Sequence, residues 1–121
     1  MTNCRALIAV FMIFISGCVS SPDRAAIDQL PEYGGLDRAS VPELKAADEW
    51  FIENTTQKYG SREVASKVWS ERGMECYFQD DLATAMKRFN QAWLLDPENY
   101  EAYWGFGAVM SDRGKYAEAI Q

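Results

Sequence analysis

Residues able to do chemistry are few in this chain of 121 residues, which has 12 basic residues, 18 acidic residues and no histidine. Without imidazole there is no Ser-His or Cys-His nucleophile pair, no histidine metal ligand and no histidine pH switch. The three cysteines, Cys4, Cys18 and Cys76, have neither zinc-ligand spacing nor the count of a disulfide framework. The net charge of −6 opposes binding to nucleic-acid phosphates.

The carboxylates and the thiol of Cys76 have simpler explanations than catalysis. Asp80 and Asp81 could bind a cation or act as acid and base, but they stand where a helix is expected to begin, and carboxylates there serve as caps. Glu71 and Glu75 have the i, i+4 spacing of a solvated helix face. A redox role for Cys76 competes with inert burial between two helices. We therefore expect no enzyme activity, no cofactor and no metal site.

Cys18 lies at the end of a short apolar segment. Residues 6–15 are ten uninterrupted apolar residues that follow Arg5, about half the length that a membrane-spanning helix needs. This length and the preceding cation are typical of the central region of a secretory signal. The segment closes with Ile15-Ser16-Gly17-Cys18.

These features resemble the signal of bacterial lipoproteins, in which an aliphatic residue and two small residues precede a cysteine. The resemblance implies that residues 1–17 are a signal peptide, that the thiol of Cys18 is lipidated and that acyl chains such as palmitate anchor the mature chain. Val19 stands where an aspartate would resemble an inner-membrane retention signal, so we expect the outer membrane, facing the periplasm, if the organism is Gram-negative. A free or buried Cys18 after an ordinary signal is the alternative.

Residues 18–41 are expected to form a lipidated tether, because prolines and a glycine pair interrupt any helical or alternating period. A flexible coil of this length would reach about 25–30 Å, with a short helix near 25–30 as an alternative over part of it. Removal of residues 1–17 takes away Arg5 and no acidic residue, so the net charge becomes −7. Cys4 leaves with the signal, and Cys76 then has no disulfide partner.

From Pro42 onward the pattern predicts an all-α region. Pro42 suits a first helical position and Gly60 a helix end, while Ser61, Asp80 or Asp81, and Asp96 can cap the helices that follow. Gly114 is expected to end the fourth helix. The expected helices span residues 42–59, 61–79, 82–95, 97–113 and 115–121, the first of them capping one end of the stack.

A shift of 34 residues overlays this region on itself, with Trp69 on Tyr103 and Ala85 on Ala119. Two helices per 34-residue unit resemble the tetratricopeptide repeat (TPR) family. The resemblance covers residues 61–121, with one complete repeat at 66–99 and a truncated one at 100–121, and it implies antiparallel helix pairs stacked as a short α-solenoid. The packing positions that it implies are Trp69, Gly73, Ala85, Phe89, Ala92, Pro97, Gly107 and Ala119.

Two positions depart from the repeat pattern, and the second repeat stops early. Arg72 stands where an apolar residue is usual and Cys76 where an aromatic residue is usual, so we expect the Arg72 stem to pack while its charge reaches solvent. The helix that carries Tyr103, Trp104, Phe106, Val109 and Met110 has little sequence left to cover it. This exposed apolar face predicts a partner, an oligomer or a truncated chain.

TPR proteins are scaffolds whose concave groove holds a peptide or a partner protein, and the resemblance implies such a groove here. Its expected residues are Lys67, Ser70, Met74, Tyr77, Glu101, Trp104, Ala108 and Ser111, with solvated surface as the simpler alternative for each. Tyr77 and Trp104 are the strongest candidates, because exposed aromatic residues often anchor interfaces. We expect a membrane-anchored interaction scaffold, with cell-envelope assembly as the role that this placement suggests. The alternatives are a fragment of a longer adaptor and, less favoured, an acidic-residue enzyme.

Overall fold

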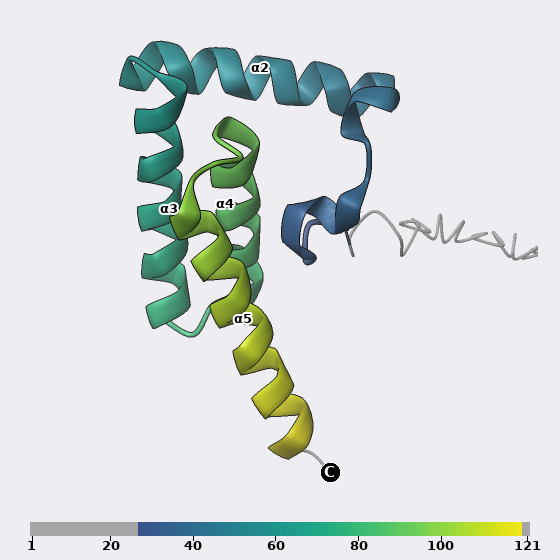
Figure 1. Ribbon diagram of the computed structural model, residues 1–121, viewed down its shortest axis with the longest axis vertical. Helices are drawn as coiled ribbons and strands as arrows, with labels where there is room; N and C mark the ends of the chain where they lie inside the picture. Colours follow the sequence, from purple (N-terminus) through teal and green to yellow (C-terminus); the bar gives the residue numbers. More distant parts are fainter. Residues whose placement is uncertain (1–26, 120–121) are drawn as a thin grey trace, which may run out of the picture.

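The computed structural model describes residues 27–119, and this part of the chain is helical with no strand (Figure 1). The all-α prediction is thereby confirmed. The predicted signal peptide and Cys18 lie outside the described residues. The elements are the 3-10 helices η1 (Pro31–Gly35) and η2 (Arg38–Ser40) and the α-helices α2 (Pro42–Tyr59), α3 (Arg62–Phe78), α4 (Leu82–Leu95) and α5 (Tyr100–Ala119).

Local sequence signals set the boundaries of α2, α3 and α4 close to where they were expected. Gly60 ends α2 with a φ of 90°, a left-handed conformation that costs glycine little. The Ser61 hydroxyl accepts a hydrogen bond from the Val64 N–H at 3.1 Å and caps α3. The Asp81 carboxylate does the same for the Thr84 N–H at 3.1 Å and caps α4.

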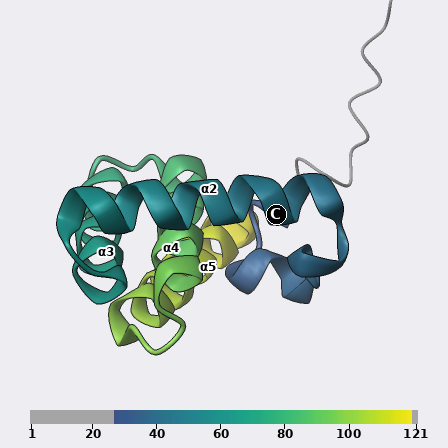
Figure 2. The same ribbon diagram turned by 90° about the horizontal axis from the view of Figure 1, so that it is seen from above.

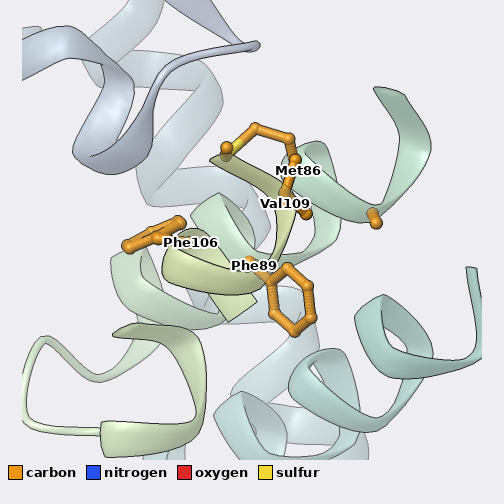
Figure 3. Packing of buried hydrophobic residues seen from close by; sticks show 5 residues of the cluster. Met86, Phe89, Phe106 and Val109 are labelled. Atoms are coloured by element: carbon orange, nitrogen blue, oxygen red, sulfur yellow. The ribbon is translucent and has the colours of Figure 1, made fainter. Parts of the chain in front are cut away.

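The core lies where α3, α4 and α5 meet. α3 and α4 form the most extensive helix pair, and α5 packs next against α4. The central buried cluster comprises Ala85, Met86, Phe89, Phe106 and Val109 (Figure 3). Full burial of a side chain such as Phe89 or Met86 stabilises the fold by about 1.5–3 kcal/mol, so this small cluster is the main apolar contribution from α4.

α2 lies across the ends of α3 and α4 (Figures 1 and 2). Its contact with α3 is aromatic, with the rings of Phe51 and Trp69 5.6 Å apart. Arg72 stacks its guanidinium over the Trp69 ring at 4.2 Å and donates a hydrogen bond to the Tyr59 hydroxyl at 3.0 Å. Arg72 therefore serves the α2–α3 contact in place of the usual apolar residue.

Residues 27–41, which we call the strap, correct the expectation of a tether that extends to residue 41. The strap packs on α4 and reaches α2, on the side of α4 opposite α3 (Figures 1 and 2). Tyr33 is buried, and its backbone N–H donates to Asn90 of α4. The sequence of the strap has no helical period. The strap instead folds as 3-10 turns that side chains of distant residues hold in place.

α5 corrects two further expectations. It begins at Tyr100 rather than directly after Asp96, because Asp96 and Asn99 form a turn in which the Asn99 N–H donates to the Asp96 carbonyl at 3.1 Å. It also continues through Gly114 to Ala119 as one helix, so no separate fifth helix starts at Lys115. Glycine ends a helix through a left-handed residue, and the only glycines with positive φ in residues 27–119 are Gly34, Gly35 and Gly60.

Candidate functional site

A surface between α3 and α5 contains four of the eight residues predicted to bind a partner. At its upper end lies a hollow of about 260 Å³ that Lys67 of α3 and Glu101 of α5 help to line. The other lining residues are Glu63, Asp96, Glu98, Asn99 and Tyr100. Four carboxylates thus face one ammonium group, which gives the hollow a net negative charge. The Oε2 atom of Glu101 is buried and has no hydrogen-bond partner in this part of the structure.

The second part of this surface is an aromatic patch, defined by Tyr77, Phe78 and Trp104. The Tyr77 ring is 5.9 Å from the Trp104 ring and 5.4 Å from the Phe78 ring, and both pairs meet edge to face. Trp104 is 49% exposed and Phe78 is 76% exposed. A hydrogen bond with the Asp112 carboxylate raises the pKa of Tyr77. Large exposed rings with fixed orientations are typical of interface anchors.

The structure brings four of the eight predicted groove residues together, in two pairs. Lys67 and Glu101 share the acidic hollow, and Tyr77 and Trp104 share the aromatic patch. Ala108 is half-buried and Ser111 is exposed, while the half-buried Met74 packs against the core cluster.

Ser70 differs from its expected place in the groove, because it is fully buried. Its hydroxyl accepts a hydrogen bond from the Asn99 Nδ2 at 2.9 Å, and the same Nδ2 reaches the Ser66 hydroxyl at 2.8 Å. Ser66 in turn donates to the Ala92 carbonyl at 2.6 Å. Ser70 therefore joins α3 to the start of α5 and is not available to a partner.

Most of the predicted packing residues lie in helix contacts. Ala85, Phe89 and Ala92 are fully buried, and Gly73 is buried against the Phe89 ring. Trp69 is half-buried and packs on α2. Pro97 is exposed in the turn before α5, and the side chain of Ala119 lies outside the described residues.

The structure corrects the prediction that Gly107 is a packing residue. It is exposed and a Cβ there would meet nothing within 4 Å, whereas Gly105 lies against the Phe89 ring. The 34-residue overlay pairs Gly73 with Gly107, but the helix face that touches Phe89 contains Gly105. The expected exposed face of α5 is corrected in part: Phe106 and Val109 are buried against α4, while Tyr103, Trp104 and Met110 are exposed.

The other residues considered for catalysis or metal binding cap a helix, lie exposed on a helix or pack against the core. Asp81 caps α4, and its hydrogen bonds with Thr84 hold the pKa of the Asp81 carboxyl below its usual value. Glu71 and Glu75 are exposed on α3, while Cys76 is half-buried against the core cluster. No three acidic or cysteine side chains in residues 27–119 come close enough together to hold a metal ion.

Sequence reasoning missed Phe78, Asn99 and Asp112. Phe78 lies one residue after Tyr77, and the helical spacing used to choose groove positions excludes neighbours in sequence. Asn99 follows Asp-Pro-Glu and falls inside the helix expected over residues 97–113, although asparagine before a helix often accepts a hydrogen bond from it. Its side chain does accept one, from the Glu101 N–H at 3.0 Å.

Comparisons with known proteins do not extend this description. No protein-family model, curated protein or solved structure matches the chain. Among the described residues, no helix combines the length and the apolar character needed to cross a bilayer.

Proposed function

We propose that this protein is a lipid-anchored scaffold of TPR type that binds a partner protein through the surface between α3 and α5. The aromatic patch is the observation that carries the proposal. Tyr77 and Trp104 come from two different helices, and their rings meet at 5.9 Å while Trp104 stays about half exposed. An exposed ring held in place by a neighbour loses little conformational entropy when a partner covers it.

The chemistry of the surface indicates the kind of segment that it would bind. Glu101 and Trp104 are three residues apart on α5, so they are neighbours on one face of the helix. The acidic hollow offers an excess of carboxylates to a cation, and the patch offers apolar area beside it. A partner segment with a lysine or arginine next to a large apolar residue fits this arrangement.

The repeat character of the scaffold is supported by Gly73, a pattern position that lies against Phe89, while Gly105 makes a similar contact from outside the pattern. Gly73 of α3 and Gly105 of α5 both lie against Phe89 of α4, so three successive helices approach one ring closely. Small residues that permit such approach, alternating with large rings, are what the TPR pattern places in its helix pairs. A stack of this kind leaves its first helices, here α3 and α5, available to a partner.

The anchor rests on the sequence Ile15-Ser16-Gly17-Cys18 and the apolar run before it. A Cys18→Ser variant should remain as an uncleaved precursor without lipid, because the thiol is the atom that lipidation modifies. Metabolic labelling with a fatty acid and the mass of the mature chain test this. Unchanged labelling and unchanged mass in the variant would defeat the anchor.

The scaffold is tested by capture from a bacterial envelope extract with the full lipidated chain. Proteins retained by the unaltered chain should be lost from Trp104→Ala and reduced with Glu101→Gln. Trp50→Ala is the matched control, since Trp50 is an exposed tryptophan on α2, 67% accessible and outside the patch. Equal recovery by Trp104→Ala and Trp50→Ala would show that the patch does not bind.

A further inference from the structure

A second surface, formed by α4 and α5 on the side away from α3, is covered by the strap (Figures 1 and 2). Asn90 lies at its centre and is fully buried. Its Oδ1 accepts a hydrogen bond from the Tyr33 N–H at 3.2 Å, and its Nδ2 donates to the carbonyls of Asp28 at 3.1 Å and Leu30 at 2.9 Å. All three bonds are to backbone atoms of the strap. Asn90 therefore fixes the course of the strap backbone and does not select particular side chains.

Side chains on the rim of this surface add selectivity. The Tyr33 ring is only 6% exposed and meets the Trp93 ring edge to face at 6.3 Å. Arg113 of α5 donates to both the backbone carbonyl and the side-chain Oε1 of Gln29. Gln29 also donates from its Nε2 to the Ala83 carbonyl at 3.1 Å. The surface thus recognises one aromatic ring and one amide, in addition to the backbone.

An ion pair with α2 also holds the strap in place. Arg38 stacks over the Tyr33 ring at 3.9 Å and makes two 2.7 Å hydrogen bonds with the Asp48 carboxylate. Arg38 and Asp48 are both largely buried, so this ion pair is shielded from solvent. The strap therefore occupies a slot between α4 and the first turns of α2.

The backbone of the docked strap is strained. Glu32 and Tyr33 have φ values of 53° and 52°, and Gly34 and Gly35 follow with 67° and 75°. Residues with a Cβ atom avoid this left-handed region, and such strain persists only where surrounding contacts hold it. Strain of this kind favours release, while the contacts of Asn90, Arg113 and Arg38 favour docking. A segment with opposing contributions of this sort is suited to switch between two states.

We propose that α4 and α5 form a peptide-docking site that the chain fills with its own residues 28–35, and that this segment undocks as a unit while the helices stay folded. The site is separate from the aromatic patch, and the proposal depends on neither the lipid anchor nor the scaffold function. Once vacated, the site binds the same segment supplied as a separate peptide, with the Tyr33 ring and the backbone as the recognised features.

The experiment uses the full chain in detergent and a fluorescent peptide of residues 27–37. A Tyr33→Ala chain has a weakened strap and an intact docking site, so it should bind the peptide at least tenfold more tightly than the unaltered chain does. The double variant Tyr33→Ala, Asn90→Ala should lose this binding, as should a peptide with alanine at the tyrosine. Leu36→Ala, an exposed strap residue, is the matched control and should behave like the unaltered chain. Failure of the Tyr33→Ala chain to bind, or equal binding by the double variant, would overturn the proposal.

Hydrogen exchange on the unaltered chain gives a second test that does not depend on how any variant folds. The Tyr33 amide should exchange at least tenfold faster than the most protected amides of α4, because undocking opens it without global unfolding. Exchange of the Tyr33 amide at the same rate as those α4 amides would show that the strap cannot be released separately.

Discussion

Gly105 on α5 lies so close to the ring of Phe89 on α4 that no Cβ atom fits between them. Gly73 on α3 approaches the same ring from its own helix, where a Cβ would come within 2.7 Å of Phe89 Cε1. One aromatic ring is therefore held between glycines of two helices, and the spacing of α3, α4 and α5 depends on it.

Gly105→Ala should destabilise the fold by about 1–3 kcal/mol, because the added methyl group meets a ring that is fully buried and cannot move away. Gly107→Ala is the control on the same helix, since its Cβ would meet nothing within 4 Å. It should stabilise the protein by about 0.5–1 kcal/mol, because alanine is the better helix former. Denaturant unfolding of both variants measures the two changes, and shifts of the same sign would contradict this account of the core.

Asn99→Ala should cost about 1–3 kcal/mol, because it removes the amide that bonds the buried hydroxyls of Ser66 and Ser70. Ser66 keeps its hydrogen bond to the Ala92 carbonyl, so the hydroxyl that loses its partner is that of Ser70. Ser111→Ala, an exposed change on α5, should stay within about 0.5 kcal/mol of the unaltered chain. Thermal unfolding followed by circular dichroism compares them, and equal midpoints would rule out a structural role for the Ser66–Ser70–Asn99 network.

The start of α4 should lose stability in acid. Hydrogen bonds with Thr84 lower the pKa of Asp81 in the folded chain. The unfolded chain therefore binds a proton more readily, so this contribution is present above the ordinary aspartate pKa of about 3.9. It is lost as the pH falls through the lower folded pKa. Asp81→Asn keeps a capping side chain without a titrating group, so its unfolding midpoint should fall less as the pH is lowered through the ordinary aspartate pKa of about 3.9. Parallel curves for the two chains would argue against the cap.

The strap should loosen at high pH. Burial raises the pKa of Tyr33, and Asp48 and Asp28 add to this rise while Arg38 opposes it. Because the folded pKa lies above the unfolded value of about 10, the stabilisation is complete below that pH and is lost as the pH rises toward the folded pKa. Tyr33→Phe keeps the ring and removes the titration. Exchange or limited proteolysis within the strap should therefore rise with alkaline pH in the unaltered chain and much less in Tyr33→Phe, and identical pH profiles would contradict it.

The helices of this fold could be predicted from local signals, but the strap could not. Ser61, Gly60 and Asp81 act through bonds to residues within a few positions, so their effect is visible in the sequence itself. Asn90 and the strap meet across about 60 residues, and no local pattern marks an asparagine that will bind backbone atoms of a distant turn. The strap was therefore predicted as tether.

The candidate site was predictable to the extent that it follows helical spacing. Tyr77 and Trp104 meet, and each stands at a position that the TPR resemblance predicts for the groove. Ser70 precedes both in the predicted series, but its hydroxyl is bonded by a turn residue, Asn99, in the interior. The sequence overlay also placed the close glycine contact at Gly107, two positions from where the packing of Phe89 requires it.

The strap gives the proposed membrane attachment an adjustable length. With lipid on Cys18, nine peptide units separate the anchor from Ile27, and a chain of that length can span at most about 30 Å. Release of residues 28–35 leaves Leu36 as the next held residue, eighteen units from Cys18, and raises this limit to about 60 Å. Docking and release of a single tyrosine-containing turn would thereby decide how far from the proposed membrane anchor the α3–α5 surface can reach.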